Sequence, residues 1–297
     1  MKANIFEIKR FAVHDGNGVR TTIFFKGCPL HCVWCHNPEG IDSNPKLAYF
    51  HNKCISCGEC VSVCPTGAHF FTGEKHNFSR EKCVACAKCA SVCLNSCLVF
   101  YGKEVSLTDV LPVLLKDKPF YDVSGGGVTL SGGECLLYDD FCAELLKRLK
   151  ENDVNTAIDT CGYVNKNVLD KVIPCTDVFL YDVKAISKNT HILCTGKDND
   201  LILDNLLYLD NKGSKIEVRI PFVPNLNSQE IPMIGKFLTK LNGLIKVRIL
   251  PYHNFAGSKY LALGMKNTLP KNLPLNKELD KAYNTLKSYN LPVVKPI

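Results

Sequence analysis

The chain has 297 residues, of which 46% are hydrophobic and 22% are charged, a composition typical of a globular protein with a well-buried core. No apolar run reaches about 18 residues, so we expect neither a membrane-spanning helix nor an export signal, and we expect a cytoplasmic protein. The formal net charge is +7, and no basic run interleaved with aromatic residues accompanies it, so a nucleic-acid partner is not expected.

Cysteine is unusually abundant, with 17 residues. In a secreted protein this number would indicate disulfides, whereas in a cytoplasmic protein it indicates metal binding or redox chemistry. Eleven of these cysteines fall in three tight motifs between Cys28 and Cys93. Bound to metal clusters as thiolates, they would add roughly −5 to the charge and leave the loaded protein only slightly basic.

The first motif follows two expected strands, residues 5–13 and Val19–Phe25, which are separated by a glycine-rich turn. Cys28, Cys32 and Cys35 then stand in C-x3-C-x2-C spacing. Three thiolates can hold three irons of a cubic 4Fe–4S cluster and leave the fourth iron open for chemistry. The alternative is a set of structural or zinc-binding thiols, but zinc usually draws four ligands from paired units, and no second pair lies close by.

Residues 41–105 are expected to form a separate unit inserted after the second strand, because a loop of this length must fold by itself. The pattern C-x2-C-x2-C-x3-C occurs in it twice. In bacterial two-cluster ferredoxins the fourth cysteine of each such run binds the other cluster. A pair of zinc sites is the alternative, and it suits four closely spaced thiolates less well. The two runs are Cys54, Cys57, Cys60, Cys64 and Cys83, Cys86, Cys89, Cys93.

Two positions of this unit differ between the repeats. Leu94 stands where the first run has Pro65, which loosens the turn. Cys97 matches Ala68, so we expect Cys97 to pack in the interior rather than to bind metal.

From residue 106 onward, apolar strand patterns alternate with helical patterns. Together with Val19–Phe25 this makes about six βα units, which predict an α/β fold with a parallel sheet. Six units fit a partial (β/α)6 barrel or an open doubly wound sheet, formed by residues 1–40 and 106–297. The expected strands are 126–131, 154–159, 177–183, 215–222 and 245–250, and the expected helices are 106–115, 136–150, 165–173, 200–211, 228–241 and 276–289.

Each expected strand ends in polar residues or glycine, which core packing does not require. Both candidate folds bring the carboxyl ends of the strands to one rim, so these residues together predict a binding site. Glycines expose backbone, Glu134 can accept from an ammonium group, and cationic side chains can hold a carboxylate. S-adenosylmethionine fits this site beside an open iron. The residues are Gly132, Gly133, Glu134, Asp159, Lys184, Arg219 and His253.

The sequence resembles the radical S-adenosylmethionine enzymes, and more closely the activating enzymes of glycyl radical enzymes. The resemblance spans nearly the whole chain. The matching segments are 15–20, 25–39, 127–134, 182–184, 195–196 with His191, 219–221 and 250–253.

This resemblance implies a partial (β/α)6 barrel and an oxidoreductase that works without oxygen. The cofactors implied are three 4Fe–4S clusters, of which one binds S-adenosylmethionine, and a monovalent cation near Asp159, Thr160 and Asp182. Cofactor contacts are implied for the rim residues and for Trp34, and Asp15 would lie near the partner's glycine loop. The enzyme would cleave the cofactor reductively to a 5′-deoxyadenosyl radical, which removes a Cα hydrogen from a glycine of the partner.

The partners implied are a glycyl radical enzyme and flavodoxin or ferredoxin as electron donor, and we expect a monomer. The inserted unit would relay electrons or shape the docking surface. Asn17 replaces a proline usual in the family's turn, and Cys135 stands where proline is common. Two alternatives remain: a radical enzyme acting on another protein or a small molecule, and an iron–sulfur electron-transfer protein.

Overall fold

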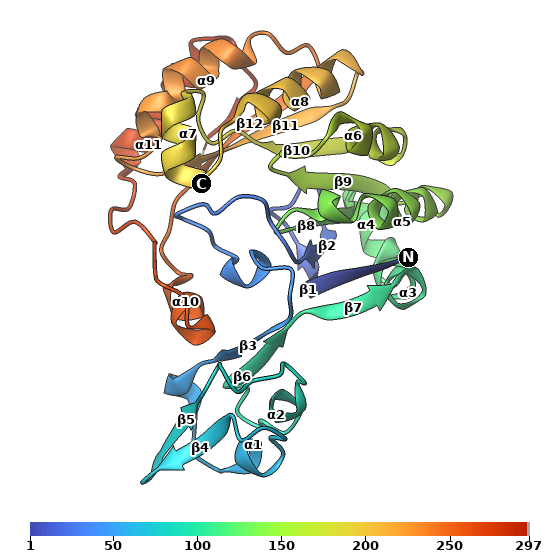
Figure 1. Ribbon diagram of the computed structural model, residues 1–297. Coiled ribbons are helices and arrows are strands. Elements are labelled where there is room, and N and C mark those ends of the chain that lie inside the picture. The colour runs from blue at the N-terminus through green and yellow to red at the C-terminus, as the bar shows by residue number, and fades with distance from the viewer. Residues whose placement is uncertain (296–297) are drawn as a thin grey trace.

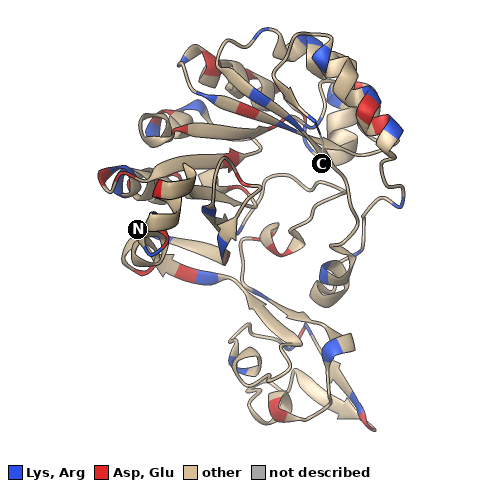
Figure 2. Ribbon diagram, turned by 180° about the vertical axis from the view of Figure 1, so that it is seen from behind, with Lys and Arg blue, Asp and Glu red and all other residues tan. Residues whose placement is uncertain are grey.

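The computed structural model describes residues 1–295, which form two parts (Figure 1). The larger part is a curved sheet with helices on its outer side, and it contains both the first and the last of the described residues. The smaller part projects from it and is formed by residues between β2 (Arg20–Phe25) and β7 (Lys103–Ser106). Acidic and basic residues are interspersed along the outer helices (Figure 2), as suits a layer that faces solvent.

The larger part is built on a sheet of order β13-β12-β11-β10-β9-β8-β2-β1-β7, in which six adjacent strands, from β2 to β12, are parallel. This arrangement confirms the expected α/β fold with six βα units, and each strand begins and ends within one residue of its predicted bounds. The six are β2 (Arg20–Phe25), β8 (Gly127–Gly132), β9 (Asn155–Thr160), β10 (Val178–Asp182), β11 (Ile216–Phe222) and β12 (Leu244–Pro251).

The sheet is extended at both edges by strands that sequence patterns describe less well. β1 (Lys2–Ala12) begins before the predicted residue 5 and runs antiparallel to β2. β7 (Lys103–Ser106) pairs with β1, so residues 103–105, at the end of the range 41–105, lie in the main sheet. β13 (Val293–Val294) pairs with β12 and is too short for any periodicity to indicate.

Most helices connect the parallel strands and cover the outer face of the sheet, whereas α10 (Gly257–Leu263) lies beside β3 (Lys46–Tyr49) of the smaller part (Figure 1). Three of them, α4, α7 and α10, were not predicted. They are short, and α7 leaves Ile192 and Leu193 exposed, so it lacks an amphipathic pattern. The helices are α3 (Leu107–Leu115), α4 (Lys118–Ser124), α5 (Asp139–Glu151), α6 (Lys166–Val172), α7 (Lys188–Thr195), α8 (Asp200–Asn211), α9 (Ile231–Leu238), α10 (Gly257–Leu263) and α11 (Asn276–Lys287).

Short 3-10 turns account for most of the difference between predicted and observed helix starts. The predicted helix 136–150 begins as the turn η3 (Cys135–Tyr138), and the predicted helix 228–241 begins as η5 (Ser228–Glu230). The other 3-10 turns are η1 (Pro38–Gly40), η2 (His51–Lys53) and η4 (Ile173–Cys175).

The two faces of the sheet differ in polarity because side chains alternate along each strand. Alternate residues, such as Leu130, Ile158 and Phe179, are fully buried in the core against the helices. Each such side chain stabilises the fold by about 1.5–3 kcal/mol. Their neighbours Ser131 and Asp159 point to the concave side. The fold therefore presents polar groups on the inside of the partial barrel.

The smaller part holds two antiparallel strand pairs and two short helices. β3 (Lys46–Tyr49) pairs with β6 (Leu98–Tyr101), and β4 (His69–Thr72) pairs with β5 (Lys75–Phe78). The helices are α1 (Glu59–Ser62) and α2 (Lys88–Ser91). Its buried core contains Leu47, Leu98 and three cysteines, one of which is Cys97. So little aliphatic core implies that bound metal contributes to the folding of this part.

Candidate active site

A cavity of about 330 Å³ lies at the carboxyl ends of the parallel strands, inside the partial barrel. Its wall combines four cysteines, two cations and a glycine turn from five different segments. Among the predicted residues, those that line it are Asp15, Cys28, Cys32, Trp34, Cys35, Gly132, Gly133, Asp159, Thr160, Asp182, Lys184 and Arg219.

The loop that carries the three cysteines is held in place by backbone hydrogen bonds from both sides. Gly27 N donates to Gly40 O (2.8 Å), and Cys28 N donates to Ile41 O (2.9 Å). On the far side, Val33 N donates to Cys194 O (2.9 Å), at the end of α7. The unpredicted helix α7 therefore fixes the position of the cysteine loop.

The cysteines of this loop are partly buried. Burial raises the pKa of Cys35 to about 12 and that of Cys32 further, because a thiolate loses its hydration there. Positively charged iron would stabilise these thiolates, and three converging sulfurs in one wall match the ligand set of a cluster with an open iron.

Gly132 and Gly133 bring the end of β8 against the cysteine loop. Gly132 has φ +122°, and a Cβ there would lie 2.1 Å from Phe25 N. A Cβ on Gly133 would lie 2.1 Å from Gly27 O and 2.5 Å from Gly40 O. Only glycine fits at these positions, so the backbone of the turn faces the cavity directly.

The sequence predicts that Glu134 accepts from an ammonium group of the cofactor. Its side chain is fully buried and does not line the cavity. One carboxylate oxygen accepts from Thr160 Oγ1 (2.8 Å) and Cys161 N (2.9 Å), and the other accepts from Leu136 N (3.2 Å). The carboxylate thus ties the ends of β8 and β9 together, instead of facing an ammonium group.

His253 also lies outside the cavity lining. Its ring stacks on His36 at 3.9 Å and on Phe255 at 4.5 Å between ring centres, and its carbonyl accepts from His36 Nε2 (2.8 Å). The cavity wall is formed instead by its neighbours Tyr252 and His36. His253 therefore supports the wall from behind in this structure.

Charged side chains are paired across the strand ends. Lys184 Nζ lies 2.6 Å from Asp182 Oδ2, and although burial opposes the charge, this aspartate holds the pKa of Lys184 above its ordinary value. Arg219 Nη1 lies 3.4 Å from Asp159 Oδ2, while its buried Nε has no hydrogen-bond partner. An anionic ligand group would satisfy that donor.

Carboxylates crowd the same region. Burial, together with the nearby Asp182, raises the pKa of Asp159 to about 6 against the opposing effect of Arg219. Ser131 Oγ donates to Asp159 Oδ2 (2.7 Å). A monovalent cation in this region would favour the ionised carboxylates. Lys184 and Arg219 could hold the carboxylate of a zwitterionic cofactor, so the residues present fit both groups.

The wall also contains residues to which the sequence assigned no role of their own, among them Ser131, His36, Tyr252 and Cys161. Cys161 follows Thr160 at the end of β9, and the proximity of its thiol lowers the pKa of Cys28. Because Cys161 follows the polar end of a predicted strand, the sequence contains a signal that could have indicated it as a site residue. Cys135 is fully buried in the core.

The smaller part brings its eight motif cysteines together at two small cavities. Each cavity is lined by three cysteines of one run and the fourth of the other, as in the two-cluster ferredoxin pattern. We call them the first auxiliary site, with Cys54, Cys57, Cys60 and Cys93, and the second auxiliary site, with Cys83, Cys86, Cys89 and Cys64. Cys97 lines the first auxiliary site, with its sulfur 3.3 Å from that of Cys93.

Comparisons with known proteins identify the family of this chain. The Radical SAM superfamily model matches residues 80–238, just over half of the chain, and the 4Fe-4S dicluster domain model matches residues 46–94. Among solved structures, SuiB of Streptococcus suis bound to its precursor peptide SuiA has a TM-score of 0.55 and 13% identity, over 90% of this chain and 46% of that one. The fold is thus that of radical SAM enzymes.

Curated relatives define the family further. The choline trimethylamine-lyase activating enzyme of Oleidesulfovibrio alaskensis is 39% identical over 98% of this chain and 97% of its own length. The trans-4-hydroxy-L-proline dehydratase activating enzyme of Clostridioides difficile is 42% identical over 88% and 87%, respectively. The chain therefore belongs to the radical SAM activating enzymes of glycyl radical enzymes.

Membership defines the activity in general terms. The protein is an oxidoreductase that uses S-adenosylmethionine and a 4Fe–4S cluster to generate a glycyl radical on a partner protein. The dicluster domain adds further iron–sulfur binding. Within residues 1–295, no helix combines the length and apolar character needed to cross a membrane.

Proposed function

We propose that Cys28, Cys32 and Cys35 hold the catalytic cluster of this activating enzyme and that S-adenosylmethionine occupies the 330 Å³ cavity beside them. The observation that carries this proposal is that the three sulfurs share one cavity with two buried cations, Lys184 and Arg219. When bound, the cluster and cofactor supply a 5′-deoxyadenosyl radical, which takes a Cα hydrogen from a glycine of the partner.

The protein's own residues position the cofactor and exclude water. Lys184 and Arg219 would offer charged donors for its carboxylate, and the backbone of Gly132 and Gly133 would be available to its amino group. Trp34 is buried and supplies an apolar wall. Asp159, Thr160 and Asp182 would bind a monovalent cation by oxygen atoms.

The test of this site is direct. The reconstituted protein, reduced by dithionite without oxygen, should release 5′-deoxyadenosine from S-adenosylmethionine, and Cys32→Ala should not. An iron–sulfur electron-transfer protein would reduce acceptors without any cleavage. Cleavage by the wild type at the level of Cys32→Ala would contradict the proposal.

The loop of Asp15 is proposed as the place where the partner's glycine enters. Asp15 lines the cavity, and its loop is held by Thr129 Oγ1, which donates to Asp15 O (2.7 Å), and by Arg219 Nη2, which donates to His14 O (2.9 Å). Asn17 accepts from Lys246 Nζ (2.7 Å), a contact that the usual proline could not make. Asp15→Asn should reduce radical transfer to the partner more than cofactor cleavage.

The two auxiliary sites are proposed to hold one 4Fe–4S cluster each, which makes three in the loaded enzyme. The helix α10 links the inserted unit to the catalytic loop: Arg80 donates to Ala262 O, and Tyr260 Oη donates to Cys35 O (3.1 Å). Cys83 of the second auxiliary site lies close to α10, because both line one surface cavity. This continuity supports electron relay from flavodoxin or ferredoxin.

Replacing Cys57 and Cys86 by alanine separates relay from a docking role. Relay predicts unchanged activation with dithionite and loss of activation with the natural donor. Loss with both reductants would indicate that the unit shapes the docking surface. Light scattering would test the expected monomer.

The particular partner is best sought among glycyl radical enzymes like those of the relatives. Choline trimethylamine-lyase and trans-4-hydroxy-L-proline dehydratase form a first panel. A glycyl radical signal in electron paramagnetic resonance identifies a partner. The enzyme could instead cleave the cofactor actively and yet give no such signal in any glycyl radical enzyme tested, including one encoded beside this gene. That outcome would favour a radical enzyme with another substrate.

A further inference from the structure

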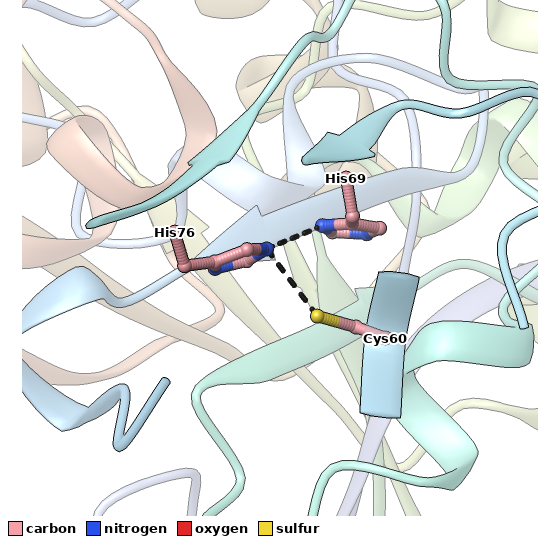
Figure 3. Close-up of side chains that lie close together, drawn as sticks. All are labelled: Cys60, His69 and His76. Carbon is pink, nitrogen blue, oxygen red and sulfur yellow. Dashed lines mark hydrogen bonds between the residues drawn. The ribbon is translucent and has the colours of Figure 1, made fainter. Parts of the chain in front are cut away.

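Two buried histidines lie between the auxiliary sites and are not part of either cysteine motif. His69 on β4 and His76 on β5 are only 2% and 5% exposed, although Phe70 and Phe71 of the same hairpin are well exposed. Figure 3 shows their rings facing each other and Cys60. His69 lines the second auxiliary site, and His76 lines the first.

His76 contacts two cysteines of the first auxiliary site with its two ring nitrogens. Its Nε2 lies 3.3 Å from Cys60 Sγ, and its Nδ1 lies 3.6 Å from Cys54 Sγ. A cysteine bound to iron has no proton and can only accept. Whichever nitrogen of neutral His76 carries the proton, the N–H faces a sulfur of the same site.

The surrounding groups favour one tautomer of His76. Tyr49 Oη lies 2.9 Å from His76 Nδ1 and can donate to it, which leaves the proton on Nε2, opposite Cys60. His69 Nδ1 lies 3.1 Å from the same Nε2 and can accept part of that hydrogen bond. Tyr49 and His69 thereby orient the imidazole of His76.

This arrangement distinguishes two otherwise matching sites. Both have one exposed and one buried cysteine at equivalent positions, and both receive a backbone N–H. Cys64 is followed five residues later by His69, whereas Cys93 is followed at the same distance by Leu98. Among the described residues, an imidazole bonds to cysteine sulfur only at the first auxiliary site.

We propose that His76, oriented by Tyr49 and His69, donates a hydrogen bond to the first auxiliary cluster and makes its reduction potential higher than that of the second. The proposal depends on the auxiliary clusters of the proposed function. A reduced cluster carries one more negative charge than the oxidised cluster, so an N–H aimed at its sulfur stabilises the reduced form more. His76 is thus a positioning and tuning residue, not a cluster ligand.

The same three side chains could instead bind a single metal ion, since Cys60 Sγ and one nitrogen of each histidine lie within 4.8 Å of one another. Such an ion would take Cys60 away from the first auxiliary site, which needs all four of its cysteines. If His76 only donates a hydrogen bond, all four cysteines remain available to the first auxiliary cluster. Zinc content decides between the two.

The experiment is a reductive titration of the full-length reconstituted enzyme. Dithionite supplies one electron to each auxiliary cluster, and electron paramagnetic resonance follows the reduction of each cluster. His76→Leu should make reduction of one auxiliary cluster about tenfold less favourable, a shift of about 59 mV to lower potential for one electron. His76→Gln, which keeps an amide donor, should shift less. His51→Leu removes an exposed ring beside Tyr49 and should shift neither cluster.

The outcomes are distinct. The affected cluster should be the one that remains when Cys86→Ala disables the second auxiliary site. Unchanged midpoints in His76→Leu with wild-type iron and sulfide contents would overturn the inference while leaving the proposed clusters intact. Wild-type protein without auxiliary cluster signals would overturn the proposed clusters themselves. Stoichiometric zinc that is lost in His76→Leu would show a metal site in place of a tuning residue.

Discussion

Gly133 offers a sharp test of how the fold positions the catalytic cysteines. Gly133→Ala adds one methyl group, whose carbon would lie 2.1 Å from Gly27 O and 2.5 Å from Gly40 O. Both contacts are backbone, and both belong to the segments that hold Cys28. Gly133 N also donates to Phe25 O (2.8 Å), and Glu134 N donates to Gly27 O (2.7 Å), so the turn cannot move alone.

The size of the effect follows from these distances. A carbon and an oxygen need more than 3 Å of separation, so the cysteine loop must shift by about 1 Å. Overpacking of this kind costs about 1–3 kcal/mol of stability. A misplacement of about 1 Å at a reacting centre lowers the rate by about 100-fold. We therefore expect a folded Gly133→Ala variant with about 100-fold slower cofactor cleavage.

The assay is formation of 5′-deoxyadenosine by the dithionite-reduced enzyme, together with thermal unfolding and iron content. Gly257→Ala is the matched control, because a Cβ there meets only side chains, at 3.5 Å or more, and Gly257 begins α10. It should retain the wild-type rate. Wild-type cleavage by Gly133→Ala, or an equal loss in Gly257→Ala, would refute the positioning argument.

Three further predictions concern buried charged groups. Arg20→Leu removes the donors to Val128 O and Thr129 Oγ1, both at 2.7 Å. It should lower the free energy of unfolding, measured by thermal unfolding, by about 3 kcal/mol, because two buried acceptors stay unpaired. A loss of stability no larger than that of an exposed arginine variant would contradict this prediction. Lys184→Met should weaken S-adenosylmethionine binding in calorimetry by about 10- to 100-fold, and the exposed Lys188→Met should leave it unchanged. The hydrogen bond from Arg10 holds the pKa of Asp117 below its ordinary 3.8, so Asp117 stabilises the fold above that pH and the contribution is lost as pH falls through the lower folded value. Asp117→Asn should therefore unfold at a lower temperature than wild type at pH 7, and this difference should close below pH 3.8; a gap that persists there would point to packing instead.

Short-range patterns in the sequence were sufficient for the main sheet and the catalytic loop. The six parallel strands are buried apolar runs, so their bounds were predicted to within one residue. The alternation of side chains then places Ser131, Asp159 and Arg219 on the concave face, whatever the curvature of the sheet. The spacing of Cys28, Cys32 and Cys35 defines a three-thiolate set within one loop. These features depend on neighbours in the chain.

What the sequence could not determine depends on contacts between distant segments. The direction of the Glu134 carboxylate follows from the position of β9, and the support of the cysteine loop follows from α7, a helix without an apolar stripe. His69 and His76 are ordinary hairpin residues in the sequence. Only the packing of that hairpin between the two auxiliary sites brings one imidazole to two sulfurs, because hydrogen bonding is set by angstrom-scale placement that residue spacing does not encode.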